Sequence, residues 1–483
     1  MTPGAPWRRV GSSSMVVAAV LGVVGVGGFL SVDDKPAQTL GAGLLVAVCG
    51  LAGVVWHPRI VYGALAFVLG AIPFGVLPGI GIPMVLIFGV AFWAALLTHP
   101  ITETRTSGLE VAVVLLVVTS LAAFIMTADS TVHYFEFAKW LLATSLVFGL
   151  LRLDRADLRT FGVVYAYGVG LAAAFGLAVF VFDKAGSSLD YLSVIGYGQT
   201  GVVGTHLRFY VADNSSVVRL TGTYVDPNAA GIFLLVGFAL SVALLRGWQR
   251  LLMAALIITA LVVTLSRSAL LSVVVGVVLF VLFQRMTTGR RLAIVVAAIV
   301  ATSAALSRPT IYSRIFTSFS STDKGSVDRA KALADYPSAM SGTWWWGRGW
   351  GAPEFTNEQI GYKTNYVANS PLLSVYRGGI FVGIAFVLIL VVGAVYAYRN
   401  ARRSPWESGV TGAMFVGFSL VGLQLDFPVV TNASMAMAFS VLIAFVAANP
   451  IERPPRADDP APESTHSPPL QPPRGSPEMV DHD

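Results

Sequence analysis

Apolar segments of about 20 residues recur along the chain, and they restrict its fold more than any other feature of the sequence. Of the 483 residues, 55% are hydrophobic and 12% are charged, about half the charged fraction of a soluble domain. A backbone that crosses lipid must satisfy its hydrogen bonds internally, which favours helices for segments of this length. The sequence therefore predicts an all-α, polytopic integral membrane protein.

Fourteen segments are apolar enough to be predicted membrane spans. They form a predicted transmembrane domain over residues 1–450, and the proline-rich stretch 451–483 is predicted to be a disordered cytoplasmic tail. Two long loops, 183–226 and 308–370, separate some of the spans, and loops of this length usually carry function. The predicted spans are 15–31, 39–56, 60–77, 80–98, 109–127, 134–151, 158–182, 227–245, 250–265, 268–284, 291–307, 371–398, 408–425 and 433–448.

The distribution of arginine predicts the orientation of the chain. Cytoplasmic loops of membrane proteins are enriched in Lys and Arg. If both termini are cytoplasmic, fifteen arginines fall on the inner face and both long loops lie outside. The net charge of +6 then reflects topology and does not indicate nucleic-acid binding. The inner arginines are Arg8, Arg9, Arg59, Arg105, Arg152, Arg155, Arg159, Arg246, Arg250, Arg285, Arg290, Arg291, Arg399, Arg402 and Arg403.

Arg219 and Arg267 lie beside apolar segments on the predicted outer face, where a charge is costly and therefore marks a candidate functional residue. The planar guanidinium group donates paired hydrogen bonds to phosphate and stays charged at any relevant pH. We therefore predict that both side chains converge on one anion. The alternative is that each extends to the outer lipid headgroups or marks a helix end.

Two short motifs are typical of helix N-termini. In Asp226-Pro227-Asn228, the aspartate is expected to cap a helix that starts at the proline. Asn369 is expected to play the same capping role in Asn369-Ser-Pro371. A role in substrate binding for Asp226, Asn228 and Asn369 is compatible with capping, because a helix N-terminus attracts phosphate.

The second long loop combines cations with aromatic residues. Arg348 lies in it, between Trp346 and Trp350, and Arg377 follows shortly after its end. Indole rings stack on sugar faces, and they also anchor proteins at membrane interfaces, so both interpretations stay open for the tryptophans. Glycines alternate through the same Gly347-Arg-Gly-Trp-Gly351 segment, which also fits a simple turn.

These motifs together resemble the O-antigen ligase/polymerase family of membrane glycosyltransferases over about Lys139 to Gly379. The resemblance implies that Arg219 and Arg267 hold the diphosphate of a polyprenyl-linked glycan donor, and that Lys139 approaches it. It further implies a glycan or lipid-glycan acceptor, polysaccharide-assembly partners and a site on the outer face of a bacterial cytoplasmic membrane. The motifs are Arg219-Leu-Thr-Gly-Thr-Tyr-Val-Asp-Pro-Asn228, Thr264-Leu-Ser-Arg-Ser-Ala-Leu270, Trp346-Gly-Arg-Gly-Trp-Gly351 and Ala368-Asn-Ser-Pro-Leu372.

One position departs from the family pattern. Ligases of this type carry a histidine immediately before the Asn-x-x-Leu element, and this chain has Ala368. The missing histidine favours a polymerase of repeat-unit polysaccharide over a ligase, and we take His206 as the candidate general base. Other outer-face candidates are His133, Asp213, Asp226, Glu354 and Asp426.

The sequence shows no pattern for a metal or a cofactor. Cys49 is the single cysteine, and no His/Cys/Asp cluster has metal-ligand spacing. No nucleotide-binding motif is present. We therefore expect metal-independent chemistry without a cofactor. The alternatives are a secondary transporter or flippase for a lipid-linked sugar, which would place its charges near the bilayer midplane, and a relative of the peptidoglycan polymerases.

Overall fold

The computed structural model describes residues 56–77, 82–99, 106–197, 208–212, 215–309, 324–353, 369–425 and 429–449, together with Val54, Tyr312 and Val367. The predicted spans 15–31 and, almost entirely, 39–56 lie outside these residues. The predicted tail from Ile451, His206 and Ala368 also lie outside them.

Each predicted span from 60–77 onward coincides with a helix, so the helical prediction is confirmed for the described part of the chain. The span at 408–425 is interrupted, because a π-helical turn (Phe418–Gly422) separates α15 from the short α16 (Leu423–Leu425). The helices are α3 (Pro58–Ala71), α4 (Met84–Leu97), α5 (Gly108–Thr127), α6 (Thr131–Arg152), α7 (Arg155–Phe182), α8 (Pro227–Leu244), α9 (Gly247–Val263), α10 (Arg267–Phe283), α11 (Thr288–Leu306), α14 (Ser370–Arg403), α15 (Trp406–Gly417) and α17 (Ala433–Ala448).

Several of these helices match the dimensions of a bilayer. Among the described residues, five helices are long and apolar enough to cross a membrane: α5, α6, α7, α8 and α14. The helices α3, α4, α9, α10 and α17 are apolar but shorter. The chain thus has the character of a multi-pass membrane protein, and the count of fourteen spans stays a prediction.

The two long loops contain secondary structure of their own. The first holds a 3₁₀ helix, η1 (Ser187–Ile195), and an antiparallel hairpin of β1 (Arg208–Ala212) and β2 (Ser215–Arg219), which pairs Arg208 with Arg219. A 3₁₀ turn, η2 (Gly222–Tyr224), follows it. The second contains α13 (Lys324–Ala339). The hairpin is the exception to the all-α prediction among the described residues.

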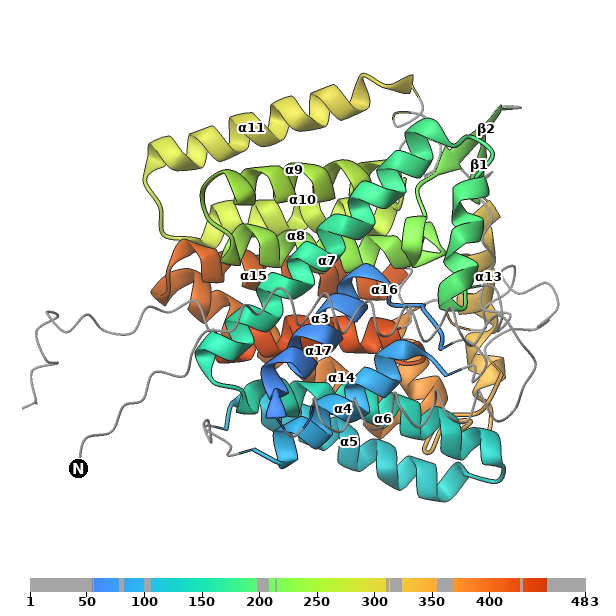
Figure 1. Ribbon diagram of the computed structural model, residues 1–483. Helices are drawn as coiled ribbons and strands as arrows, with labels where there is room; N and C mark the ends of the chain where they lie inside the picture. Colours follow the sequence, from blue (N-terminus) through green and yellow to red (C-terminus); the bar gives the residue numbers. More distant parts are fainter. Residues whose placement is uncertain are drawn as a thin grey trace, which may run out of the picture. The chain divides into compact units, whose positions relative to one another are not determined.

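Close packing around α8 organises the bundle (Figure 1). Helix α8 contacts α7, α9, α10, α15 and α17, and 83% of its residues are buried. Helices α3 and α7 approach each other through glycines: a Cβ on Gly70 would lie 2.6 Å from the carbonyl oxygen of Tyr165. Small residues permit such close contact between membrane helices. The core is therefore built from side chains and backbone packed at short range.

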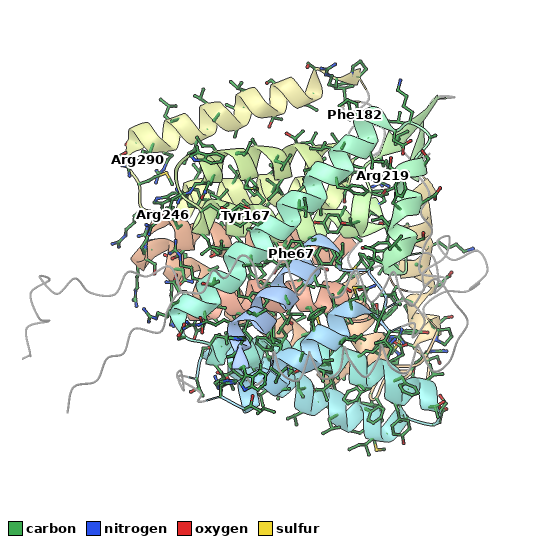
Figure 2. All side chains as sticks on the ribbon, in the orientation of Figure 1. Phe67, Tyr167, Phe182, Arg219, Arg246 and Arg290 are labelled. Carbon is green, nitrogen blue, oxygen red and sulfur yellow. The ribbon has the colours of Figure 1, made fainter. Side chains whose placement is uncertain are left out.

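Successive antiparallel helices place their connecting turns at two opposite ends. Phe182 at the end of α7 and Arg219 lie at one end, whereas Arg246 and Arg290 lie at the other (Figure 2). We call the first the site end. It carries the N-termini of α8 and α10 and the C-termini of α7 and α9.

Candidate functional site

Arg219, the last residue of β2, is held by two hydrogen bonds to different helices. Its Nε donates to the carbonyl oxygen of Thr264 at 2.9 Å, and its Nη2 donates to Oδ1 of Asn228 at 3.0 Å. Thr264 caps the C-terminus of α9, and Asn228 lies in the first turn of α8. These bonds fix the plane of the guanidinium group between two helix ends, with the side chain half-buried.

The turn bonded to Arg219 also carries Arg267. Leu220 donates its backbone N–H to the carbonyl oxygen of Val263 at 3.2 Å, so the end of the hairpin follows the end of α9. Arg267 begins α10 three residues after Thr264, and its side chain is half-buried. The structure thus brings the turn of Arg267 against Arg219. The convergence of the two side chains on one anion stays a prediction.

The helix caps around Arg219 form as predicted. Oδ1 of Asp226 accepts from the backbone N–H groups of Asn228 at 2.7 Å and Ala229 at 3.3 Å, and Pro227 occupies the first turn of α8. Asn228 therefore accepts a hydrogen bond from Arg219 with its side chain and donates one to the capping Asp226 with its backbone N–H. The predicted contact of Asp226 and Asn228 with substrate stays a prediction.

Backbone strain is concentrated beside these residues. Among the described residues, three that are not glycine have positive φ angles, and two of them are Val225 (68°) and Leu265 (53°). Val225 directly precedes the cap of α8, and Leu265 lies between Thr264 and Ser266. A β-branched or bulky residue rarely adopts positive φ, and such strain tends to occur where function requires an unusual backbone. Both turns around Arg219 carry this feature.

Buried tyrosines hold the strained turn in place. The hydroxyl of Tyr224 donates to the carbonyl oxygen of Gly70 at 3.0 Å, and its ring stacks on Phe233 at 5.2 Å. The hydroxyl of Tyr197 donates to the carbonyl oxygen of Thr223 at 2.7 Å. The turn before Asp226 is therefore fixed to α3, to α8 and to the loop that follows α7.

A second candidate region is a break in α14, where a loop supplies hydrogen bonds that the helix lacks. Gly379 has φ 77° and ψ −177° inside the helix, so the regular hydrogen-bond ladder stops there. Residues 343–353, which we call the tryptophan loop, supply replacement bonds. Arg348 donates its backbone N–H to Tyr376 O at 2.7 Å, and Ile380 donates to Trp344 O at 2.9 Å. The broken helix and the loop therefore form one hydrogen-bonded unit.

The buried side chain of Arg377 also belongs to this unit. Its Nη1 donates to the carbonyl oxygens of Trp350 and Ala352, both at 2.5 Å, and the residue is only 5% exposed. Backbone Gly349 in turn donates to the carbonyl oxygen of Arg377 at 3.1 Å. In this structure Arg377 holds the loop; its predicted contact with substrate stays untested.

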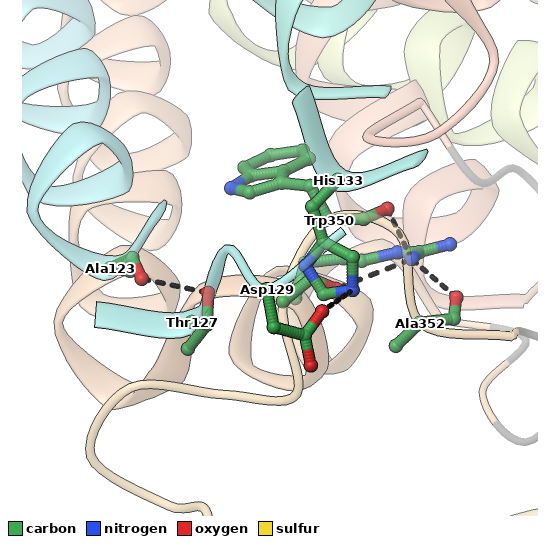
Figure 3. A network of polar contacts seen from close by, with 8 residues as sticks. Ala123, Thr127, Asp129, His133, Trp350 and Ala352 are labelled. Carbon is green, nitrogen blue, oxygen red and sulfur yellow. Dashed lines mark hydrogen bonds and ion pairs between the residues drawn. The ribbon is translucent and has the colours of Figure 1, made fainter. Parts of the chain in front are cut away.

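The glycines of the loop allow it to enclose His133. A Cβ on Gly349 would lie 2.4 Å from Cε1 of His133, and one on Gly351 would lie 2.3 Å from its Cδ2. Nε2 of His133 lies 3.5 Å from Oδ1 of Asp129 (Figure 3). Trp350 is 2% exposed, with its ring 4.2 Å from that of Trp140. The alternating glycines thus serve close packing, and Trp350 has no open ring face.

Other loop side chains point outward. Trp346 is 40% exposed, with its ring centroid 6.2 Å from that of Phe381, and Trp345 is 65% exposed. Arg348 is exposed, and its Nε donates to the carbonyl oxygen of Ala339 at 2.6 Å. Exposed indole rings and an exposed guanidinium group in one loop are suited to a charged sugar, because rings stack on sugar faces and arginine binds anions.

The remaining predicted residues have partners of their own. Oδ1 of Asn369 caps α14 by accepting from Leu372 N at 3.1 Å, and its Nδ2 donates to Oε1 of Gln424 at 2.9 Å. Lys139, in α6, pairs with Glu136 through Nζ and Oε1 at 2.5 Å. The cap at Asn369 is confirmed. The prediction that Lys139 approaches a diphosphate stays untested.

Sequence reasoning missed three contributors to these regions. The carbonyl of Thr264 is a backbone group without a side-chain signature. Gln424 lies outside all four of the sequence motifs described above. The break at Gly379 had a signal, because paired glycines such as Gly378-Gly379 are a common cause of helix kinks.

Comparison with known families supports part of this picture. Residues 252–372 match the family model described as O-antigen ligase. The match runs from α9 to the first turn of α14 and includes Arg267 and the tryptophan loop, which confirms the resemblance over this part of the chain. Arg219 and Asn228 precede the matched residues. No curated protein matches the chain.

Proposed function

From the match of residues 252–372 to the O-antigen ligase family, we propose that this protein is a membrane glycosyltransferase that uses a polyprenyl-diphosphate-linked glycan donor. The observation that supports this most directly is the hydrogen bond from Arg219 to the turn that carries Arg267. Two guanidinium groups on adjoining elements suit a diphosphate.

The proposed step is the displacement of the diphosphate from the donor sugar. The acceptor hydroxyl oxygen forms a bond to the anomeric carbon while the bond from that carbon to the phosphate oxygen breaks. The hydroxyl proton passes to a base, for which His206 is the candidate. Negative charge develops on the leaving phosphate, and Arg219 and Arg267 stabilise it most where it is largest, in the transition state.

We assign sugar binding to the exposed part of the tryptophan loop. Trp345 and Trp346 are exposed, and the exposed Arg348 of the same loop is held by its bond to Ala339. The break in α14 fixes this surface, because the bonds at Tyr376 and Ile380 tie the loop to a helix. Because Ala368 stands where family ligases have histidine, the proposal favours a polymerase of repeat units.

Arginine-to-lysine exchange tests the proposal. Lysine keeps the charge but loses the paired donors, so Arg219→Lys and Arg267→Lys should each lower turnover roughly tenfold to a thousandfold, the range for losing one charge-stabilising donor. The assay is polymer formation in a strain of the source organism that lacks its own copy. Arg290→Lys, an exposed arginine at the opposite end (Figure 2), is the matched control.

Two outcomes would count against the proposal. Normal polymer from both lysine variants, at equal protein levels, would remove these arginines from the site. Proteoliposomes that move the lipid-linked donor across the bilayer without forming a new glycosidic bond would indicate a carrier instead.

A further inference from the structure

Three arginines surround the C-terminus of α8, at the end opposite Arg219. Nη2 of Arg159 in α7 donates to the carbonyl oxygen of Leu244 at 3.0 Å, and Nε of Arg250 in α9 donates to that of Leu245 at 2.7 Å. Arg246 lies in the exposed turn between α8 and α9, and its charge and that of Arg250 both act on Arg159. We call Arg159, Arg246 and Arg250 the arginine cluster.

The arginine cluster carries more positive charge than its neighbours neutralise. Glu407 is the carboxylate that acts on Arg159, and its Oε1 lies 3.7 Å from Nη2 of Arg250. The C-terminus of α8 contributes about half a negative charge. Within the described residues, neither Arg159 nor Arg246 forms an ion pair with a carboxylate. Three positive groups therefore face about one and a half negative charges.

The acidic residues at the start of α7 do not supply the difference, because they are paired elsewhere. Nε of Arg59 lies 2.7 Å from Oδ1 of Asp157, and its Nη2 lies 4.0 Å from Asp154. Helix capping does not explain the whole cluster either. Arg159 and Arg250 bind the last carbonyls of α8, whereas Arg246 makes no side-chain capping bond to α9.

Exposed apolar side chains lie directly beside the arginine cluster. In the first turns of α9, Trp248 is 69% exposed, Leu251 is 72% exposed and Leu252 is 51% exposed. The guanidinium group of Arg250 also lies 4.7 Å from the centroid of the Trp406 ring at the start of α15. A cationic group next to exposed tryptophan and leucine matches the boundary between lipid headgroups and acyl chains.

We propose that the arginine cluster binds the phosphate of an anionic phospholipid, whose acyl chains cover Trp248, Leu251 and Leu252. The guanidinium fork matches phosphate oxygens, and binding supplies the missing negative charge. A membrane lipid fits better than free phosphate because the apolar side chains need a hydrocarbon partner. The inference does not depend on glycosyl transfer, since this site lies at the end opposite Arg219 (Figure 2).

Lipid binding to the purified full-length protein tests the proposal. Native mass spectrometry would count the molecules of dioleoylphosphatidylglycerol or dioleoylphosphatidylcholine retained during titration. We expect the wild-type protein to prefer phosphatidylglycerol, and Arg246→Gln to weaken its binding about fivefold, the effect of one arginine near a lipid surface. Arg246 is chosen because its side chain makes no capping bond. Arg290→Gln, an exposed arginine at this end but outside the arginine cluster, should weaken binding less than Arg246→Gln does.

Inorganic phosphate separates the two possible sources of the anion. If millimolar phosphate displaced phosphatidylglycerol completely, the cluster would be a site for the free anion and the lipid proposal would be wrong. Equal retention of phosphatidylglycerol by wild type and Arg246→Gln would also overturn it. An unchanged melting temperature of Arg246→Gln, measured without lipid, shows that the variant is folded.

Discussion

Nη2 of Arg219 donates a hydrogen bond to Oδ1 of Asn228 across 3.0 Å, so a residue in the first turn of α8 orients a guanidinium group at the end of a β-hairpin. The backbone of Asn228 is fixed by the Asp226 cap. The orientation of Arg219 therefore depends on a rigid helix end. In the proposed function, Asn228 acts through Arg219 and is a positioning residue.

Replacing Asn228 by alanine should disturb catalysis more than stability. The change leaves the charge of Arg219 but removes the hydrogen bond from its Nη2 to Asn228, and a misplacement of a catalytic group by about 1 Å can lower turnover about a hundredfold. We expect Asn228→Ala to lower kcat by about tenfold to a hundredfold, with a smaller effect on KM. Steady-state kinetics with purified protein and lipid-linked donor would measure both values.

Asn400 provides the matched control. Its Nδ2 donates to the carbonyl oxygen of Val446 at 2.9 Å near the C-terminal end of α14. Asn400→Ala should lower the free energy of unfolding by about 1 kcal/mol, the typical value of one hydrogen bond, and leave kcat unchanged. Equal loss of kcat in both variants would show that general destabilisation, and not the orientation of Arg219, explains the effect.

The break in α14 should tolerate no side chain at Gly379. Its φ and ψ lie in a region that only glycine adopts readily, and a Cβ would lie 2.0 Å from the carbonyl oxygen of Trp345. We expect Gly379→Ala to cost at least about 1–3 kcal/mol of stability and to detach the tryptophan loop. Thermal unfolding and protease cleavage within residues 343–353 would report the two effects.

Gly63→Ala is the opposite case. Gly63 lies inside α3, and a Cβ there would meet nothing within 4 Å. Alanine should raise stability by up to about 1 kcal/mol, because glycine is a poor helix former. A loss of stability there as large as that of Gly379→Ala would refute the steric explanation for Gly379.

The parts of the fold that depend on local sequence were predictable. Apolar length alone located the described apolar helices, because lipid leaves the backbone few alternatives, whereas the polar α13 in the second long loop was not predicted. The caps at Asp226 and Asn369 were also predictable, since a capping side chain binds backbone groups two or three residues away. Both features are decided within one turn of helix.

The parts that depend on distant contacts were not predictable. Arg219 binds the carbonyl of Thr264, 45 residues away, and any residue type offers the same carbonyl. Trp350 is of a residue type that can stack on sugars, yet its ring packs against that of Trp140 in α6. Whether a tryptophan is exposed or buried is decided by the tertiary contacts of the loop that carries it.

Sidedness can be checked with single cysteines. The distribution of the fifteen inner arginines predicts that residues 308–370 lie outside and the tail lies inside. After Cys49→Ala, a membrane-impermeant maleimide added to intact cells should label Ser321→Cys and not Ser464→Cys. Permeabilised cells control for reactivity, because both positions should then be labelled. The reverse pattern in intact cells would overturn the orientation.

The carboxylate of Asp183 should keep its hydrogen bonds to the following turn down to low pH. Hydrogen bonds from the backbone N–H of Ser188, and also from Gly186, hold the pKa of its carboxyl group down at about 2. Because the folded pKa lies below the unfolded value of about 3.9, the stabilisation is complete above that value and is lost as the pH falls toward 2. Hydrogen exchange at Ser188 should show this loss.

Asp183→Asn provides the reference for that measurement. It removes the titrating group, so protection at Ser188 should be weaker and should not show the additional loss between about pH 4 and pH 2. If wild type and variant lost protection in parallel over this range, another group would be responsible for the effect.

Turnover should continue in excess chelator. In the proposed step, Arg219 and Arg267 supply the positive charge that a divalent ion provides in other phosphate chemistry. Among the described residues, no group of three His, Cys, Asp or Glu side chains could hold a metal ion. The donor's own phosphates can bind Mg²⁺, so the assay must use saturating donor with EDTA in excess over all divalent ions. Turnover that stops under these conditions, and returns with Mg²⁺ alone, would show that the two arginines are not sufficient.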